Sequence, residues 1–109
     1  MNEWIWFFVV EVRARKAETQ ALVEGSTALL QCFLTATTIE DALHQLDDFL
    51  AAEAFDRLAI RKAQSFEHDF TRDEIGNDVV FAGLRQAAAS GLPHKGTMVV
   101  AREAAAWKS

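Results

Sequence analysis

The chain begins with a run in which nearly every side chain is apolar, residues 4–12. Its even positions are apolar throughout, whereas its odd positions are apolar up to Val9 and turn polar at Glu11. Because side chains alternate between the two faces of a strand, this pattern predicts a strand whose first half is buried on both faces and whose second half is buried on one. Burial on both faces favours a central position in a sheet. We expect Trp4 and Trp6 in the core, with their indole N–H groups bonded to the backbone.

Three later segments also have strand patterns. Residues 27–35 carry aliphatic and small side chains at alternate positions, and residues 96–101 form a shorter apolar run. Residues 58–66 are more polar, and Lys62 and Gln64 interrupt the face that also holds the apolar side chains. That polarity predicts an edge strand or a strand with one wet face.

The connection between the first two strands has two interpretations. Residues 15–24 have the composition of a short helix ended by Gly25, and they equally fit a hairpin whose return strand is bulged at that glycine. We favour the hairpin, because so short a segment barely suffices for a crossover between parallel strands.

The first long helix is predicted to begin after Thr37 and to extend at least to Leu50. Thr37, followed by Glu40 three residues later, has the pattern of a capping box, and apolar residues recur from Ile39 to Leu50 with the spacing of one helix face. We expect this face to lie on the sheet, with the acidic side of the helix in solvent.

A second helix is predicted from Asn77 or Asp78 to Ser90. Gly91 suits the left-handed position after a helix, and Leu92 suits the hydrophobic contact that often follows it. The preceding residues 67–76 form a polar connection.

The resulting order β-β-α-β-α-β predicts one α+β domain over residues 1–109, since this length fits one domain and is too short for two. We expect a two-layer sandwich in which two main helices cover a mostly antiparallel four-stranded sheet, either ferredoxin-like or a variant of that fold. Residues 102–109 are expected to form a flexible or helical tail.

The charge distribution changes the picture more than the net charge of −5. Residues 39–56 contain six carboxylates and no Lys or Arg. This concentration argues against nucleic-acid binding, which needs basic surface. It also suggests that Asp41, Asp47 and Asp48 form a docking face for a basic protein, although charged runs are usually only solvated.

The location expected from the sequence is the cytoplasm, without a membrane. The apolar N-terminal run is much shorter than the about 20 residues that span a bilayer, and no basic stretch precedes it. The single cysteine, Cys32, suits a reducing compartment and is expected to be a small buried hydrophobe.

Catalytic and metal-binding patterns are weak in this sequence. His44 lies one helical turn from Glu40 and from Asp48, and His68 stands between two acidic residues, so these two histidines are the candidates for proton transfer. No His-x-x-x-His or Cys-x-x-Cys pattern occurs, and we expect neither a metal nor another cofactor.

Three functions remain open. The first is a non-enzymatic interaction protein that forms homo-oligomers; Ile5, Phe7 and Val9 are its dimer face if the second helix leaves them uncovered. The second is an acidic inhibitor of the immunity or antidote type, which binds a basic protein. The third is a small-ligand binder or an enzyme with a histidine-based site, and of the three we favour an enzyme least.

Overall fold

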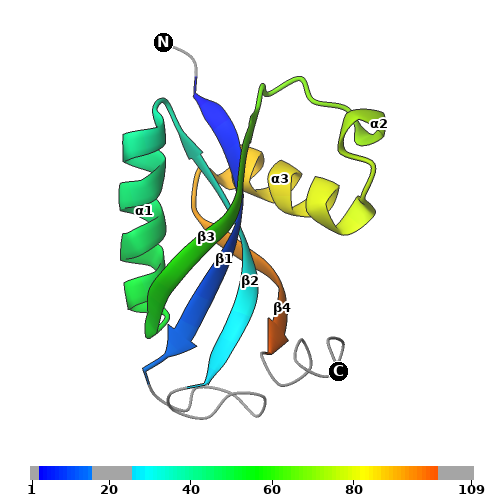
Figure 1. The fold of residues 1–109 in the computed structure, drawn as a ribbon. Helices are drawn as coiled ribbons and strands as arrows, with labels where there is room; N and C mark the ends of the chain where they lie inside the picture. Colours follow the sequence, from blue (N-terminus) through cyan, green and yellow to red (C-terminus); the bar gives the residue numbers. More distant parts are fainter. Residues whose placement is uncertain (1–2, 16–25, 101–109) are drawn as a thin grey trace.

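The computed structural model describes residues 3–15 and 26–100 (Figure 1). The elements follow one another as four strands and three helices: β1 (Trp4–Ala14), β2 (Thr27–Ala36), α1 (Ile39–Ala52), β3 (Phe55–Phe66), α2 (Arg72–Ile75), α3 (Asp78–Ser90) and β4 (His94–Val100). They form an α+β fold with one four-stranded sheet. None of the helices in these residues is long and apolar enough to cross a membrane.

The sheet has the order β3-β1-β2-β4, and every neighbouring pair is antiparallel. The central position predicted for β1 is therefore confirmed, and β3 lies at an edge. β1 and β2 pair antiparallel, whereas the choice between a short helix and a return strand bulged at Gly25 concerns residues 16–25, which lie outside the described residues. The ferredoxin-like arrangement is not confirmed, because the strand order is β3-β1-β2-β4.

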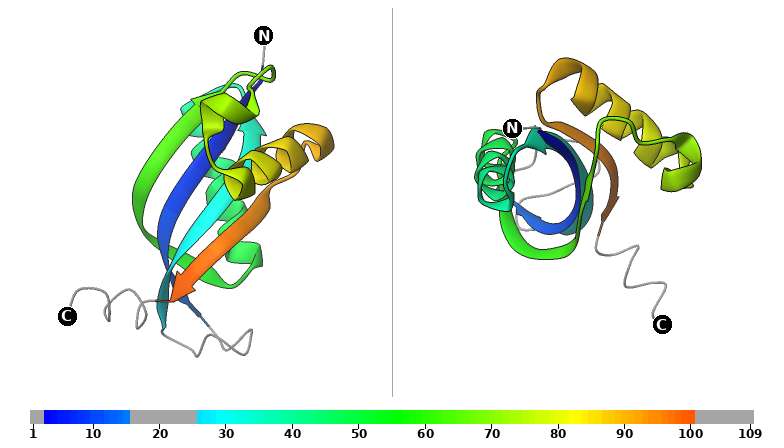
Figure 2. Two further views of the ribbon diagram at one scale, coloured as in Figure 1. Left: turned by 90° about the vertical axis from the view of Figure 1, so that its right-hand side faces the viewer. Right: turned by 90° about the horizontal axis from the view of Figure 1, so that it is seen from above.

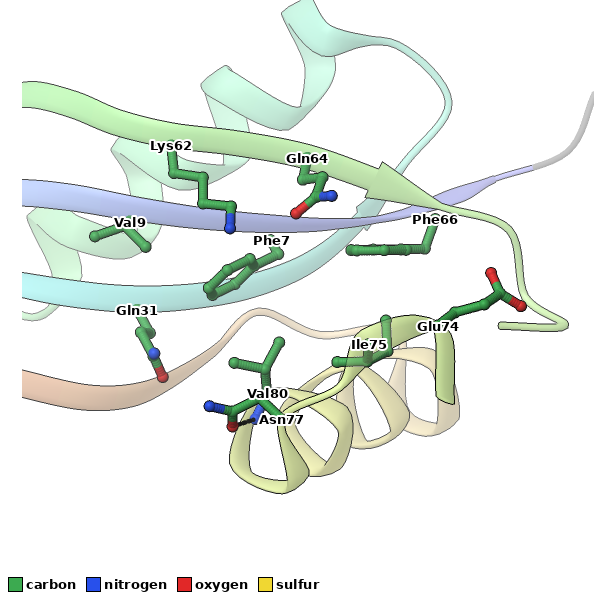
Figure 3. Close-up of a pocket in the computed structure, with 10 residues that line it drawn as sticks. All are labelled: Phe7, Val9, Gln31, Lys62, Gln64, Phe66, Glu74, Ile75, Asn77 and Val80. Carbon is green, nitrogen blue, oxygen red and sulfur yellow. Dashed lines mark hydrogen bonds between the residues drawn. The ribbon is translucent and has the colours of Figure 1, made fainter. Parts of the chain in front are cut away.

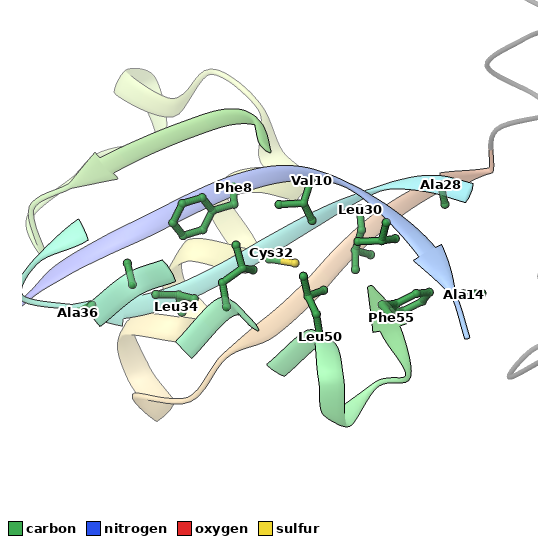
Figure 4. Packing of buried hydrophobic residues seen from close by; sticks show 13 residues of the cluster. Phe8, Val10, Ala14, Ala28, Leu30, Cys32, Leu34, Ala36, Leu50 and Phe55 are labelled. Carbon is green, nitrogen blue, oxygen red and sulfur yellow. The ribbon is translucent and has the colours of Figure 1, made fainter. Parts of the chain in front are cut away.

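One face of the sheet, here called the α1 face, packs against α1 (Figure 4). The even positions of β1 and β2, such as Phe8 and Leu34, meet Leu46 and Leu50 of the helix and are almost fully buried. Trp6 stacks on Phe8 with ring centroids 6.0 Å apart. Sheet and helix form the two-layer part of the fold.

On the opposite face, here called the α3 face, the helix α3 covers only one end of the sheet (Figure 2). Ile5, Phe7 and Phe33 of the sheet pack there against Val80 and Leu84 of α3, and their side chains are at most 5% exposed except for Val80 at 8%. The odd positions of β1 were thus correctly expected to need cover from a second element.

The contact of α3 with the sheet depends on a glycine. A Cβ atom on Gly83 would lie 2.4 Å from Cε2 of Phe33, and one on Gly96 of β4 would lie 2.7 Å from the same carbon. Real carbon atoms do not approach so closely, since their optimal separation is about 3.5–4.0 Å. The Phe33 ring therefore fills the space that two missing side chains leave.

Several local expectations were wrong. The N-cap of α1 is Thr38, whose hydroxyl oxygen accepts a hydrogen bond from the Asp41 N–H, so the cap lies one residue later than predicted at Thr37. The polar connection contains the short helix α2, with a capping box made by Thr71 and Glu74. Leu92 is 62% exposed, whereas the hydrophobic contact expected after α3 would have buried it.

The two N-terminal tryptophans differ. The indole nitrogen of Trp6 donates a hydrogen bond of 3.1 Å to the Ala36 carbonyl, as expected for a core position. Trp4, the first residue of β1, is 36% exposed. The predicted tail, residues 102–109, lies outside the described residues.

Candidate ligand-binding cleft

A cleft opens on the α3 face at the point where the cover by α3 ends (Figure 3). It has a cavity volume of ≈ 390 Å³, within the range typical of small-molecule sites. Its lining comes from three strands, from α2 and from the start of α3: Phe7, Val9, Gln31, Lys62, Gln64, Phe66, Glu74, Ile75, Asn77 and Val80.

The floor of the cleft follows from the register of the sheet. Val9 of β1 lies between Gln31 of β2 and Lys62 of β3, and these three side chains form one row across the strands. In the next row Phe7 lies beside Gln64. The centre of the floor is therefore apolar and its flanks are polar.

Lys62 and Gln64 reach this face because β3 is bulged. The pairing of β3 with β1 shifts between Val9 and Val10, so that Ile60 pairs with Val10 while Lys62 pairs with Val9. Ile60 consequently packs toward the α1 face, and the assignment of Ile60 and Lys62 to one face was wrong. A bulge places two residues opposite one and thereby changes the face that follows.

The far wall of the cleft is held by aromatic side chains. Phe70, which precedes α2, is 5% exposed and packs against Phe66 and Phe81, with ring centroids 6.3 and 5.5 Å away. The guanidinium of Arg72 lies 4.9 Å from the centre of the Phe81 ring. These contacts fix α2 against α3, and with it the position of Ile75 in the wall.

The carboxylate of the cleft and two of its three amides, Gln31 and Asn77, already accept hydrogen bonds from the chain. Glu74 accepts from the N–H and the hydroxyl of Thr71, both at 3.3 Å. The Oδ1 atom of Asn77 accepts from the Val80 N–H at 3.1 Å, and the Oε1 atom of Gln31 accepts from the Thr97 N–H at 3.3 Å. The acceptor oxygens of these side chains are engaged, whereas the NH₂ groups of the two amides make no hydrogen bond within the described residues.

Lys62 supplies the only cation in the lining. Its ammonium nitrogen lies 5.6 Å from the centre of the Phe7 ring, an arrangement that attracts the charge to the ring face. Among the residues that the structure describes, Lys62 has no acidic partner, whereas its neighbour Arg61 pairs with Glu11.

The comparisons with known proteins assign no function to the cleft. No family model, curated protein or solved structure matches the chain. No group of three acidic, histidine or cysteine side chains within the described residues has the geometry to hold a metal ion. The cleft offers one ammonium, one carboxylate, amide groups and apolar carbon.

The candidate dimer face is largely covered. Ile5 is 0% and Phe7 is 5% exposed beneath α3, and only Val9 remains half-buried on the floor of the cleft. The surface formed by these three side chains is thus reduced to the cleft itself.

The acidic residues of α1 are exposed, and one of them is paired. Asp47 accepts two hydrogen bonds from the guanidinium of Arg57 on β3, at 2.7 and 3.2 Å. Asp41 lies in the first turn of α1 and Asp48 on its outer side. A docking face built on all three carboxylates would have to include or displace Arg57.

The two candidate histidines lie apart from the cleft. His44 is exposed on α1, on the other side of the sheet, and His68 is exposed in the connection between β3 and α2. His94 contacts the Ser90 hydroxyl at 2.7 Å, but that oxygen also accepts the Leu92 N–H and serves the turn after α3. His44 shares α1 with the candidate carboxylates Asp41, Asp47 and Asp48, whereas neither His44 nor His68 lines the cleft.

Cys32 has the properties expected of a structural residue. It is 1% exposed on the α1 face, and burial raises the pKa of its thiol from 9.0 to about 12. The nearby Lys95 lowers this pKa and Glu53 raises it, both less than burial does. A thiol held in its protonated form is a poor nucleophile.

Polar positions in β3 were the only sequence signal for the cleft. Lys62 and Gln64 interrupt an otherwise partly apolar strand, which marks a place where polar side chains are used on a sheet face. The contributions of Gln31, Asn77 and Ile75 carried no such signal, because each belongs to the cleft only through the packing of another element.

Proposed function

We propose that this chain is a non-enzymatic binding protein that takes a small organic molecule in the cleft on the α3 face. The observation that carries this proposal is the combination of an apolar floor, Phe7 and Val9, with polar groups on three sides. Pockets that hold small molecules combine apolar side chains with polar groups that orient the ligand, and this cleft has both, although half of its lining residues are polar. The proposal extends the broader expectation of a non-enzymatic interaction protein.

A ligand screen with a matched pair of variants tests this proposal. Thermal-shift screening of a metabolite library identifies binders, and chemical shifts of backbone amides locate them. Val9→Phe fills the floor of the cleft and should abolish binding. Leu29→Phe enlarges another half-buried side chain of the same sheet that does not line the cleft, and it should leave binding intact. If the screen yields no ligand whose binding is abolished by Val9→Phe, the proposal is wrong.

Self-association remains a second proposal, and the exposed apolar side chains at one end of the molecule favour it. Trp4 is 36% and Ile39 is 38% exposed, and β1 and α1 both begin at this end (Figure 1). Exposed aromatic and aliphatic groups that lie close together are typical of contacts between proteins. Light scattering during size-exclusion chromatography should give a dimer or larger for the wild type and a monomer for Trp4→Lys. Val79→Lys alters a different exposed apolar residue and should not change the mass.

Recognition of a basic protein by α1 is also a proposal, supported by the exposure of Asp41 and Asp48. A cytoplasmic location likewise remains a proposal, which rests on the lone free cysteine.

A further inference from the structure

The polar groups of the cleft are almost all hydrogen-bond donors. The side-chain oxygens of Gln31 and Asn77 accept backbone N–H groups, which turns each amide so that its NH₂ group is the part left for a ligand. Lys62 can only donate. Gln64, for which the described residues provide no hydrogen bond, is able to donate or accept.

The single carboxylate of the cleft does not reverse this pattern. Glu74 closes the capping box of α2, where it accepts from the N–H and the hydroxyl of Thr71. Figure 3 shows it beside Ile75, with Lys62 across the cleft above Phe7. Glu74 keeps its negative charge, but its carboxylate is turned away from Phe7 in Figure 3, so the charge that faces the apolar floor is positive.

From this arrangement we infer that the ligand is a small organic anion, a carboxylate attached to one flat apolar ring system. This inference rests on the proposed binding function and specifies its ligand class. The carboxylate lies at Lys62 and accepts from the donor amides, while the ring contacts the partly exposed apolar side chains of the lining, Val9, Phe66 and Ile75. Ammonium–carboxylate hydrogen bonds are about twice as strong as neutral ones.

Three probes that share one ring system separate the contribution of charge from that of shape. Indole-3-acetate carries a carboxylate, indole-3-acetamide a neutral amide, and tryptamine an ammonium group. Titrations followed by amide chemical shifts should give the tightest binding for indole-3-acetate. Tryptamine should leave the resonances of the cleft unperturbed at millimolar concentration, because its cation meets Lys62.

Two variants test the donors and one serves as control. Lys62→Met retains the methylene stem over Phe7 but removes the charge, and it should weaken binding of indole-3-acetate about tenfold or more. Asn77→Asp retains the acceptor that caps α3 while it replaces the NH₂ donor by an anion, so it should also weaken binding at unchanged stability. Arg61→Met removes the adjacent cation, whose partner is Glu11, and should have no effect.

The outcomes distinguish the two claims. If indole-3-acetamide or tryptamine binds in the cleft as tightly as indole-3-acetate, or if Lys62→Met binds indole-3-acetate like the wild type, the assignment of an anionic ligand is wrong while the binding function stands. If neither the three probes nor any library compound perturbs the cleft, both claims fail.

Discussion

Replacing Gly83 by alanine has two effects on the free energy of unfolding, and these effects have opposite signs. Gly83 lies inside α3, and in an exposed helix interior the change from glycine to alanine raises the free energy of unfolding by about 1 kcal/mol. Here the new Cβ would lie 2.4, 2.5 and 2.7 Å from three carbons of the Phe33 ring. Relief requires a shift of about 1 Å, because carbon atoms prefer about 3.5–4.0 Å.

The Phe33 ring has little room for such a shift. It is 1% exposed, its centroid lies 5.4 Å from that of the Phe7 ring, and Gly96 of β4 packs against it. Overpacking of a filled core costs about 1–3 kcal/mol. At the upper part of that range the clash exceeds the gain in helix propensity. We therefore expect Gly83→Ala to lower the free energy of unfolding by about 1–2 kcal/mol.

Urea unfolding followed by circular dichroism measures this difference. The reverse change at the neighbouring exposed position, Ala82→Gly, calibrates helix propensity alone and should cost about 1 kcal/mol. In a Phe33→Leu background the penalty of Gly83→Ala should shrink, since the smaller side chain leaves room for the methyl group. If Gly83→Ala instead stabilises the protein, α3 does not rest on Phe33 in the way described.

Three further predictions concern other parts of the molecule. Ala54 has φ 63°, a left-handed conformation that favours glycine, so Ala54→Gly should raise the free energy of unfolding by about 1 kcal/mol. Urea titrations measure this change, and a lower free energy of unfolding in Ala54→Gly would show that Ala54 is not strained. Since the pKa of the Cys32 thiol is raised to about 12, the folded state keeps its proton while the unfolded chain ionises. Stability should therefore be complete below about pH 8.5 and fall between about pH 9 and 12, by at most about 1.4 kcal/mol per pH unit, and the same pH slope in Cys32→Ala would disprove this linkage. Charge reversal at Asp41 and Asp48, which unlike Asp47 have no ion pair within the described residues, should abolish capture of a basic partner in pull-down experiments; unchanged capture would exclude this surface.

The burial pattern of β1 illustrates how far a local pattern reaches. Its alternation predicted a central strand with two buried faces near the start, and Ile5, Phe7 and Phe8 are indeed buried. The same reasoning failed at Trp4, which is apolar but, as the first residue of the strand, is 36% exposed. A periodic pattern reports which face a side chain takes, whereas cover depends on where the neighbouring element ends.

Helix signals behaved in the same manner. The end of α3 was predicted correctly at Gly91, whose φ of 71° is a local property of glycine in a left-handed turn. The start of α1 was displaced by one residue, since Thr37 and Thr38 carry the same hydroxyl and only the packing of the helix on the sheet selects between them. The helix α2 was missed because four residues are too few for a periodic pattern.

The sequence by itself determined the strand and helix content, the central position of β1 and the burial of Cys32, because these depend on the spacing of apolar residues along the chain. The tertiary structure alone decided the cleft. A bulge in β3 places Lys62 on the face of the sheet opposite Ile60. The packing of α3 against Phe33 places Asn77 and Ile75 in the lining of the cleft. Both depend on contacts between residues far apart in the chain, which no local pattern of side chains specifies.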